Sequence, residues 1–487
     1  MRVCGIESTD TLVPPDRPLR VVIVGGGASG VLVAARTLDA SIARSVQVTI
    51  VDPSDVLAAG VAYSTVDPEH LLNVRASGMS ADPSSPDDLV EWITATGEGG
   101  RDTFVPRRDY RRYLEQHLRH AAQQAPDGTL ELCRDRAIGI RMGDTTTRVA
   151  LASGAHLDAD HVVLALGNSA PGVPESLRGL EGRPGWIPDP WAPGVLEPYV
   201  GAPNVLLVGT GLTMVDIAIT LGRDGDRPGE ASSEGCATAP RLMALSRNGL
   251  VPLRHLEFQP PRPIDIVDLD RDSVDVLALD RRIRARILDH EGRQYPDENW
   301  REVIDAVRPF ANALWRRYDS EQRRTFLTQL LRQWDVHRHR MSPVTAERFD
   351  ALQASGRLRI HTGQVLVASP DPAGGMMVEL DLDGERTELQ VDAVVNCTGP
   401  GRSWSPPGNP VVMDLIDQGL AVPDEHGLGL RTTPEGLLVD VGGRPVPQVL
   451  VIGPPRRGTL FETTAVPELR SQALHLADHM VIGVPFA

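Results

Sequence analysis

Two segments of the chain share one pattern, in which an apolar strand leads into a glycine-rich turn and the turn leads into a helix. The first copy covers residues 19–38 and places Gly25, Gly27 and Gly30 in the turn, and the second copy covers residues 204–221. Such a turn brings the backbone and the first amides of a helix close to the pyrophosphate of a dinucleotide. The repeat therefore predicts an α/β fold with two Rossmann-like dinucleotide-binding domains.

The first turn has the full three-glycine spacing of a dinucleotide site. A second apolar strand, residues 46–51, ends at Asp52, where a carboxylate accepts hydrogen bonds from a ribose diol. The alternative is an ordinary tight turn with a surface aspartate, but strand, turn, helix and acidic residue occur in the expected order. The residues predicted to hold this dinucleotide are Gly25, Gly27, Ala28, Ser29, Gly30 and Asp52.

The second turn is less complete, because Met214 stands where the third glycine would be. Its following strand ends in Ser246 and Arg247 instead of an acidic residue. Arg247 attracts a 2′-phosphate that an aspartate would repel, so we predict NADPH rather than NADH at this turn. The alternative is a solvated arginine at the end of a strand. The residues predicted for this site are Gly209, Thr210, Gly211, Leu212, Thr213, Ser246 and Arg247.

The segments around the two turns predict the domain organisation. Each turn is followed by three short strand-like stretches and then an apolar strand that ends in a glycine, Gly167 in one copy and Gly399 in the other. Helical spacing dominates the stretch that we interpret as an insertion into the second domain. We predict a flexible leader at 1–18, a first domain of 19–200 and 400–487, and a second domain of 203–399 that contains the helical insertion 271–352.

The charge of the chain limits its partners. It has 49 basic and 65 acidic residues, hence a net charge of −16, and all of the basic residues are arginine. Nucleic acid and anionic membrane surfaces repel such a chain and are not predicted as partners. Without lysine there is no Schiff-base or P-loop lysine. Phosphates and carboxylates must be bound by arginines or by backbone amides.

The cysteines and the apolar runs point to the cytoplasm. Four cysteines lie far apart, at Cys4, Cys133, Cys236 and Cys397, and form no C-x-x-C pair. Neither a disulfide framework nor a metal site is predicted from this spacing. No apolar stretch approaches the ~18 residues of a membrane span. We therefore expect a cytoplasmic protein that has no metal and no membrane segment.

Five strings outside the turns carry a family resemblance. They are Gly60-Val61-Ala62-Tyr63-Ser64, Leu71-Leu72-Asn73-Val74, Phe104-Val105-Pro106-Arg107-Arg108, Trp334-Asp335-Val336-His337-Arg338-His339-Arg340 and Ala465-Val466-Pro467-Glu468. With them the chain resembles, from Arg20 to Met480, bacterial FAD/NAD(P)-binding flavoproteins with two dinucleotide-binding domains, built like glutathione reductase. Some members of this family are similar to aspartate N-hydroxylases. More distantly, the stretch from Pro106 to Leu114 is similar to flavin-dependent amino-acid N-hydroxylases.

The resemblance implies FAD in the first domain and NADPH in the second, with the nicotinamide meeting the flavin where the domains touch. Tyr63 and Asn73 would lie near the isoalloxazine. Gly167 and Gly399 would lie where the chain crosses between the domains. The residues implied for FAD beyond the first turn are Tyr63, Asn73, Arg108, Gly167 and Gly453, with Gly399 on the NADPH side. Pro454 departs from the pattern, because an aspartate that binds FAD is common at that position.

The resemblance and the cysteine spacing together narrow the chemistry. A flavin disulfide reductase needs paired cysteines, and the F-x-G-x-x-x-H fingerprint of Baeyer–Villiger enzymes is absent. The prediction is an FAD-dependent, NADPH-using monooxygenase that N-hydroxylates a small amino acid such as aspartate through a flavin C4a-hydroperoxide, with O2 as the second substrate. The alternatives are an NADPH-dependent flavin reductase or dehydrogenase with a small organic acceptor, and a non-catalytic nucleotide-binding sensor. Whether the chain forms a homo-oligomer is left open.

A cationic string near the end of the insertion supplies candidates for the substrate site. It contains His337, Arg338, His339 and Arg340. Arginine binds carboxylates through two parallel hydrogen bonds, so we predict that some of these side chains face a polar substrate. The alternative is that they cap the helix and pair with acidic surface groups.

Overall fold

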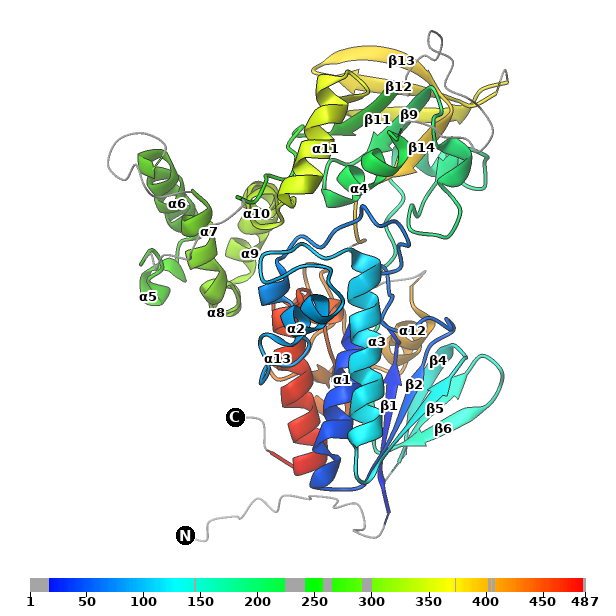
Figure 1. The fold of residues 1–487 in the computed structure, drawn as a ribbon, viewed down its shortest axis with the longest axis vertical. Coiled ribbons are helices and arrows are strands. Elements are labelled where there is room, and N and C mark those ends of the chain that lie inside the picture. Colours follow the sequence, from blue (N-terminus) through cyan, green and yellow to red (C-terminus); the bar gives the residue numbers. More distant parts are fainter. Residues whose placement is uncertain are drawn as a thin grey trace.

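Two sheets of mainly parallel strands dominate the structure (Figure 1). The computed structural model describes residues 17–143, 146–223, 241–256, 265–290, 300–372, 374–401, 404 and 408–484. The predicted α/β class with two Rossmann-like halves is confirmed. Most of the predicted leader, residues 1–16, lies outside the described part. Arg17 at its end forms an ion pair with Asp160, with 2.7 Å between nitrogen and oxygen.

The first sheet takes strands from both ends of the chain. Its order is β15-β16-β7-β1-β2-β3, and all neighbours are parallel except β15 and β16. The strands are β1 (Leu19–Val24), β2 (Val46–Val51), β3 (Gly128–Cys133), β7 (His161–Leu164), β15 (Leu437–Val439) and β16 (Pro445–Val451). The apolar runs of β1 and β2 fit strands that are covered on both faces.

Alternate residues of β1 enter two different cores. Val21 and Ile23 pack with the helices α1 (Ala28–Asp39), α3 (Arg107–Gln124) and α13 (Val466–Ala477). Val22 and Val24 pack with α12 (Pro410–Asp417) and with a separate antiparallel sheet. That sheet consists of β4 (Ala137–Met142), β5 (Thr147–Leu151) and β6 (His156–Ala159). A short helix, α2 (Asp88–Ala95), adds to the first core.

The second sheet, at the top of Figure 1, has the order β13-β12-β11-β10-β9-β14-β8. Its strands are β8 (Trp186–Ile187), β9 (Asn204–Val208), β10 (Arg241–Ser246), β11 (Leu358–Pro370), β12 (Met376–Leu382), β13 (Glu385–Val391) and β14 (Ala393–Asn396). β12 and β13 continue this sheet as antiparallel edge strands, whereas the corresponding strands of the first half form their own sheet. Helices α4 (Leu212–Leu221) and α11 (Pro343–Ala354) pack together in its core.

The helical insertion projects to the left of both sheets in Figure 1. It consists of α5 (Leu269–Asp272), α6 (Val276–His290), α7 (Trp300–Val307), α8 (Ala311–Arg317), α9 (Ser320–Thr325), the π-helical turn η6 (Phe326–Leu330) and α10 (Leu331–Arg338). The predicted insertion extended to residue 352, but α11 differs from the other helices. Its Ala346, Phe349 and Leu352 pack in the core of the second sheet, so α11 is part of that half.

Candidate functional site

The first turn joins β1 to α1, and two of its glycines are required by the protein itself. Gly25 has φ +111°, a region that favours glycine, and a Cβ there would collide with the carbonyl oxygen of Ala165. A Cβ on Gly30 would collide with the carbonyl oxygen of Gly25. These two glycines therefore allow β1, β7 and α1 to approach each other closely.

Gly27 is different, because a Cβ there would only touch Gly60 at 3.5 Å, an ordinary van der Waals distance. The missing side chain leaves space in front of α1. Gly27 is the N-cap of α1 and offers no side chain to cap it, so the N–H groups of Ala28 and Ser29 stand without a helical acceptor. These features fit a phosphate at this helix end. Sequence analysis missed that Gly60 faces the turn, although Gly60 begins one of the family strings.

Asp52 lies beside the same turn, as predicted for the ribose side of the site. Its Oδ2 accepts a hydrogen bond from the N–H of Gly26 at 2.7 Å, and its Oδ1 accepts one from the N–H of Ser54 at 2.8 Å. These bonds fix the carboxylate in place. Each oxygen keeps a lone pair that a ribose hydroxyl can use.

The second turn joins β9 to α4 with the same geometry. Gly209 has φ +108°, and a Cβ there would collide with the carbonyl oxygen of Cys397. A Cβ on Gly211 would meet nothing within 4 Å, so this turn is also open in front of its helix. Gly211 gives α4 no side-chain cap, which leaves the amides of Leu212 and Thr213 available. Met214, in the place of the third glycine, is fully buried in the core.

Hydrogen bonds join the second turn to the end of β10. The hydroxyl groups of Thr210 and Ser246 lie 2.8 Å apart, and Thr210 also donates to the carbonyl oxygen of Leu250 at 2.6 Å. Arg247, the next residue after Ser246, is exposed. The predicted residues for the second dinucleotide thus lie together around one turn and one strand end.

Arg332 of α10 also reaches this turn, and sequence analysis missed it. Its Nη2 donates to the carbonyl oxygen and to the hydroxyl of Thr210, both at 3.1 Å, and to the carbonyl oxygen of Leu250. Thr210 and Arg332 are 122 positions apart in sequence, so no local pattern could have linked them.

Gly167 follows β7 and Gly399 follows β14, and the chain segments beyond them lie side by side. The hydroxyl of Ser169 donates to the carbonyl oxygen of Gly401 at 2.5 Å, and the Asn396 amide donates to that of Gly172 at 3.2 Å. A Cβ on Gly167 or on Gly399 would meet nothing within 4 Å. Both glycines therefore border open space at the crossover between the halves.

Two residues predicted near the isoalloxazine lie in different surroundings. The Tyr63 ring packs edge-on against Tyr110, with 5.0 Å between the centroids, and burial raises the pKa of Tyr63 to about 12. The carbonyl oxygen of Asn73 accepts a hydrogen bond from Nε2 of His255 in the second half, at 3.1 Å. Asn73 therefore lies at a contact between the halves, whereas Tyr63 is a packing residue of the first core.

Arg108 and Gly453 complete the residues implied for FAD. Arg108, in the first turn of α3, has its Nε 3.6 Å from the carboxylate of Asp109. Gly453 lies against α1, because a Cβ there would be 2.9 Å from the hydroxyl oxygen of Ser29. Its N–H donates to the side chain of Gln472 at 3.2 Å. The loop after β16 thus reaches the start of α1 without the aspartate that is common after Gly453.

Two of the four substrate candidates pair with carboxylates of the protein. Arg338 is buried, and its Nε lies 3.4 Å from Oε1 of Glu462. Arg340 is buried, pairs with Asp305 at 2.8 Å and stacks over Trp300 at 5.1 Å. Both guanidinium groups thus pair with carboxylates, Arg340 with an exposed one, as the alternative interpretation predicted, and Arg338 with the buried Glu462.

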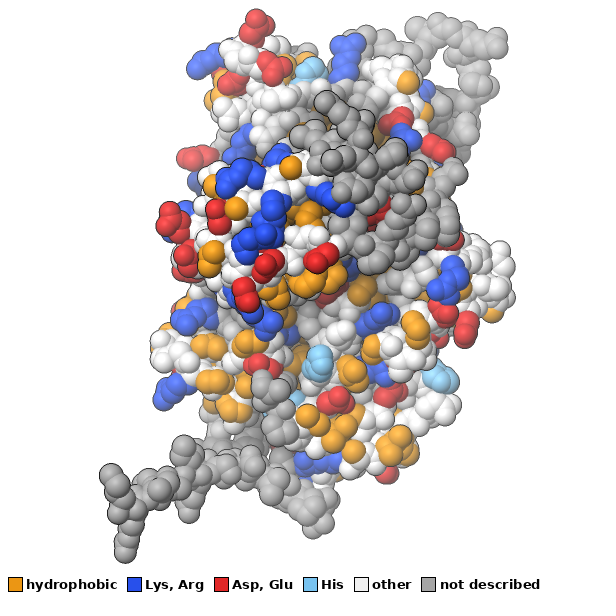
Figure 2. All heavy atoms as spheres, turned by 90° about the vertical axis from the view of Figure 1, so that its left-hand side faces the viewer, with side chains coloured by type: hydrophobic (Ala, Val, Ile, Leu, Met, Phe, Trp, Pro, Cys, Tyr) orange, Lys and Arg blue, Asp and Glu red, His pale blue; other side chains and the backbone are white. Residues whose placement is uncertain are grey.

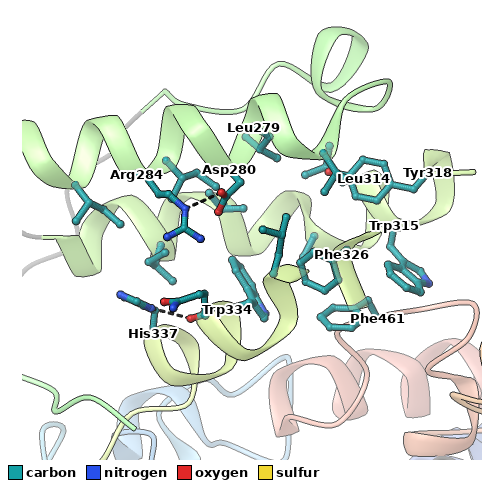
Figure 3. Close-up of a pocket in the computed structure, with 18 residues that line it drawn as sticks. Leu279, Asp280, Arg284, Leu314, Trp315, Tyr318, Phe326, Trp334, His337 and Phe461 are labelled. Atoms are coloured by element: carbon teal, nitrogen blue, oxygen red, sulfur yellow. Dashed lines mark hydrogen bonds and ion pairs between the residues drawn. The ribbon is translucent and has the colours of Figure 1, made fainter. Parts of the chain in front are cut away.

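The two histidines of the string do not face the glycine turns in a shared pocket. His337 lines an apolar cavity of about 330 Å³ inside the insertion, next to Trp334 and across from α6 (Figure 3). Its Nδ1 donates to the carbonyl oxygen of Gln333 at 2.7 Å. His339 lies outside this cavity, 3.9 Å from Asp335. Most of the lining is apolar and its one arginine, Arg284, pairs with Asp280, so this cavity is a poor fit for an amino-acid head group.

Four arginines lie near the hydrogen bond between His255 and Asn73. The arginine junction, as we call this group, consists of Arg75, Arg254, Arg301 and Arg340. Burial, and then the charges of Arg340 and Arg75, lower the pKa of His255 to about 4. Burial, and then Arg340 and Arg254, lower the pKa of Arg301 to about 10. Three exposed carboxylates, Asp102, Asp305 and Asp350, offset part of this positive charge.

Two features are absent from the described part of the chain, a helix that could span a membrane and a cluster of metal-binding side chains. In the described ranges, no helix is long and apolar enough to cross a membrane. The same residues contain no group of three or more histidine, cysteine, aspartate or glutamate side chains that could hold a metal ion.

The fold is similar to that of known flavoproteins. Residues 22–169 match a protein family described as FAD-NAD(P)-binding. None of the curated proteins compared matches the chain. Among solved structures, L-lysine 6-monooxygenase from Pseudomonas syringae is 15% identical, with a TM-score of 0.61 over 96% of this chain and 99% of that chain.

Two further solved structures are similar over almost their whole length. The ornithine N-hydroxylase from Kutzneria sp. 744 is 13% identical, with a TM-score of 0.61 over 95% of this chain and 99% of that chain. The cadaverine monooxygenase from Erwinia amylovora is 14% identical, with a TM-score of 0.59 over 96% of this chain and 95% of that chain. The resemblance to two-domain flavoproteins and N-hydroxylases is confirmed in the fold.

Proposed function

We propose that the protein is an FAD-dependent, NADPH-using monooxygenase that hydroxylates the amino nitrogen of a small amino acid such as aspartate. The observation that carries this proposal is the pair of glycine turns. Each contains a glycine, Gly27 or Gly211, that has free space at the position of a Cβ and precedes a helix without a side-chain N-cap. The fold around these turns is similar to that of N-hydroxylases.

The first turn would hold FAD. The open position at Gly27 and the amides of Ala28 and Ser29 fit the pyrophosphate, and Asp52 fits the ribose of the adenosine. Gly453 would contact the cofactor beside the start of α1. When bound, FAD supplies the redox chemistry, which is hydride acceptance from NADPH and activation of O2.

The second turn would hold NADPH. The open position at Gly211 and the amides of Leu212 and Thr213 fit its pyrophosphate. Ser246 and Arg247 lie at the strand end where the ribose 2′ position would be recognised, and an arginine favours the 2′-phosphate of NADPH. Gly167 and Gly399 leave space at the crossover, where the nicotinamide would meet the flavin.

The relatives support a nitrogen as the position of reaction. The similar structures are of enzymes named for lysine, ornithine and cadaverine, which all carry a primary amine. The Kutzneria structure contains reduced FAD, NADP⁺ and L-ornithine. The proposal for this chain is the same type of reaction on an amine, with O2 as the second substrate.

The arginine junction favours an acidic amino acid over a diamine. A diamine would bring positive charge to a place where Arg254 and Arg340 already repel the charge of Arg301. A carboxylate there would be attracted, and arginine binds carboxylates with two parallel hydrogen bonds. We therefore place the substrate carboxylates at this junction, where the carboxylates that pair with Arg75, Arg254 and Arg340 are exposed, whereas the partner of Arg338 is the buried Glu462.

Aerobic turnover with a panel of amines tests the proposal. Purified protein with FAD, NADPH and O2 is offered aspartate, ornithine, lysine or cadaverine, and NADPH oxidation and hydroxylamine product are measured. We expect hydroxylamine from aspartate. NADPH oxidation that no amine accelerates, with no hydroxylated product, would contradict the proposal, and anaerobic NADPH oxidation by an organic acceptor would favour a reductase.

One substitution tests the substrate position separately. Arg75→Gln should raise the KM for aspartate about tenfold or more, because one charge-assisted hydrogen bond contributes about 1.5–3 kcal/mol. The FAD content should not change. Arg119→Gln, at an exposed position of α3, is the control and should leave the KM unchanged. An equal KM in both variants would place the substrate elsewhere.

A further inference from the structure

The second glycine turn is contacted by a charged group from another part of the fold. Arg332 of α10 is half-buried, and its Nη2 is occupied by Thr210 and Leu250 of the turn region. Those acceptors are two carbonyl oxygens and one hydroxyl, all uncharged. Within the part of the chain that the structure describes, no carboxylate lies within 4 Å of this guanidinium.

Several other arginines of the insertion pair with carboxylates. Figure 2 shows the side of the molecule that carries the insertion, where arginine side chains lie among acidic ones. Several of them form ion pairs with carboxylates, namely Arg282 with Asp272, Arg284 with Asp280, Arg308 with Glu468, Arg317 with Asp270, Arg338 with Glu462 and Arg340 with Asp305. Arg332 has instead only the more distant attraction of Asp335, while burial lowers the pKa of its guanidinium.

A half-buried cation without a nearby anion is costly, because it loses part of its hydration and gains only neutral hydrogen bonds. The cost is removed when an anion binds beside it. The position of Arg332 suggests which anion, since Thr210 lies between Gly209 and Gly211 and its hydroxyl contacts Ser246. Arg332 therefore contacts a residue that is part of the second turn and that is hydrogen-bonded to the end of β10.

We propose that Arg332 binds a phosphate group of the nicotinamide dinucleotide, so that the helical insertion contributes a cofactor-binding residue to the second glycine turn. This inference rests on the proposed function, because it takes the second turn to be the NADPH site. It adds a residue to the ones that the turn itself supplies.

The test measures nucleotide binding without turnover. NADP⁺ and NAD⁺ are added separately to the FAD-loaded wild type and to Arg332→Gln and Arg332→Lys. The dissociation constant is measured by calorimetry, and the rise in melting temperature is measured against each variant's own nucleotide-free value. That reference separates a loss of cofactor contact from a change in basal stability. Arg323→Gln is the matched control, because Arg323 is also half-buried in the insertion and donates to a carbonyl oxygen, that of Trp315 at 3.1 Å.

We expect Arg332→Gln to weaken NADP⁺ binding about tenfold or more, since a hydrogen bond to a charged group is lost, and Arg323→Gln to leave it unchanged. Arg332→Lys should retain part of the affinity, because the cation remains. A loss for NADP⁺ alone assigns the 2′-phosphate, and an equal loss for NAD⁺ assigns the pyrophosphate. Unchanged binding in Arg332→Gln overturns the inference. A wild type that binds neither nucleotide overturns the proposed function itself.

Discussion

At the scale of single residues, glycines of the same turn serve different purposes. Gly25 and Gly30 are needed for the chain to pack, because any side chain there would collide with a backbone carbonyl. Gly27 and Gly211 have room for a side chain within the protein. Packing within the protein therefore does not require glycine at these two positions, whereas the proposed phosphate in front of each helix would.

This difference predicts two separable effects of alanine. Gly27→Ala should fold with nearly wild-type stability but lose FAD affinity by about tenfold, because the methyl group occupies the approach to the amides of α1. Gly30→Ala should lower the melting temperature strongly, because its Cβ meets the carbonyl of Gly25. The measurements are flavin content after purification and thermal unfolding. Stoichiometric FAD of unchanged affinity in Gly27→Ala would show that the turn is misassigned.

Arg247 should set the choice between the two nicotinamide cofactors. Arg247→Ala is expected to raise the KM for NADPH about tenfold or more and to leave the KM for NADH nearly unchanged, because only NADPH carries the 2′-phosphate. Steady-state NADPH and NADH oxidation measure both values. Equal changes for the two cofactors would refute the role of Arg247.

His255 predicts how stability depends on pH. In the folded protein its pKa is about 4, below the ordinary value of 6.5, so the unfolded chain binds a proton that the folded chain excludes. The stability contributed by the neutral form is complete above pH 6.5 and is lost as the pH falls towards 4. Between pH 7 and pH 5, urea unfolding should show the wild type losing about 1–2 kcal/mol more than His255→Gln.

The control for that experiment is His156→Gln, an exposed position on β6. It should lose stability in parallel with the wild type. If His255→Gln also follows the wild type at every pH, the histidine is not kept neutral by burial and the arginines.

At the scale of elements, local patterns predicted the strands and helices that form the turns. The predicted strand at 46–51 matches β2, since a short apolar run next to a glycine turn depends only on neighbouring residues. The limits of the insertion were less predictable, because α11 has the same helical spacing as α10. What distinguishes α11 is the sheet against which it packs, and local spacing does not encode that contact.

The contacts at the candidate site also fall into two groups, those within one continuous motif and those between segments that are distant in sequence. The turn residues were found from sequence because each motif is continuous. Arg332, and the hydrogen bond between His255 and Asn73, depend on segments that meet only in the folded chain. The charges of the string at residues 337–340 predicted contact with a substrate, but they did not predict the carboxylates of Glu462 and Asp305, which pair with Arg338 and Arg340 from other segments.

The insertion is anchored to the first half by an aromatic side chain. Phe461, in the loop before α13, is 7% exposed and lies with its ring 5.0 Å from those of Trp315 and Phe326. Phe461→Ala should cost about 3 kcal/mol of unfolding free energy, as for other buried phenylalanines. Urea unfolding measures this cost. Val441→Ala, at a position that is 70% exposed, should cost little, and equal costs would contradict the anchoring role.

At the scale of the whole molecule, polar contacts hold the two halves in one orientation. Arg107 of α3 forms an ion pair with Asp216 of α4 at 2.7 Å, with both side chains largely buried. The ring of His70 lies 2.9 Å from the hydroxyl of Thr220. These contacts join α3 and the loop before it to α4, and they fix the orientation on which the proposed function depends.

Removing this ion pair should disturb electron transfer more than flavin binding. Arg107→Gln leaves the Asp216 carboxylate buried without its partner, at a cost of about 3–5 kcal/mol. FAD content should stay near the wild-type value, while NADPH reduces the flavin at least tenfold more slowly. Arg148→Gln, which breaks an exposed ion pair with Asp158, is the control. Equal reduction rates in the two variants would show that the pair does not set the orientation.

The central claim is that the two turns bind FAD and NADPH close enough for direct hydride transfer. Anaerobic titration of the purified, FAD-loaded protein with NADPH tests this most directly. We predict a yellow protein whose flavin absorbance is bleached by one equivalent of NADPH. A protein that stays colourless after incubation with FAD, or a bound flavin that NADPH leaves oxidised, would contradict the account.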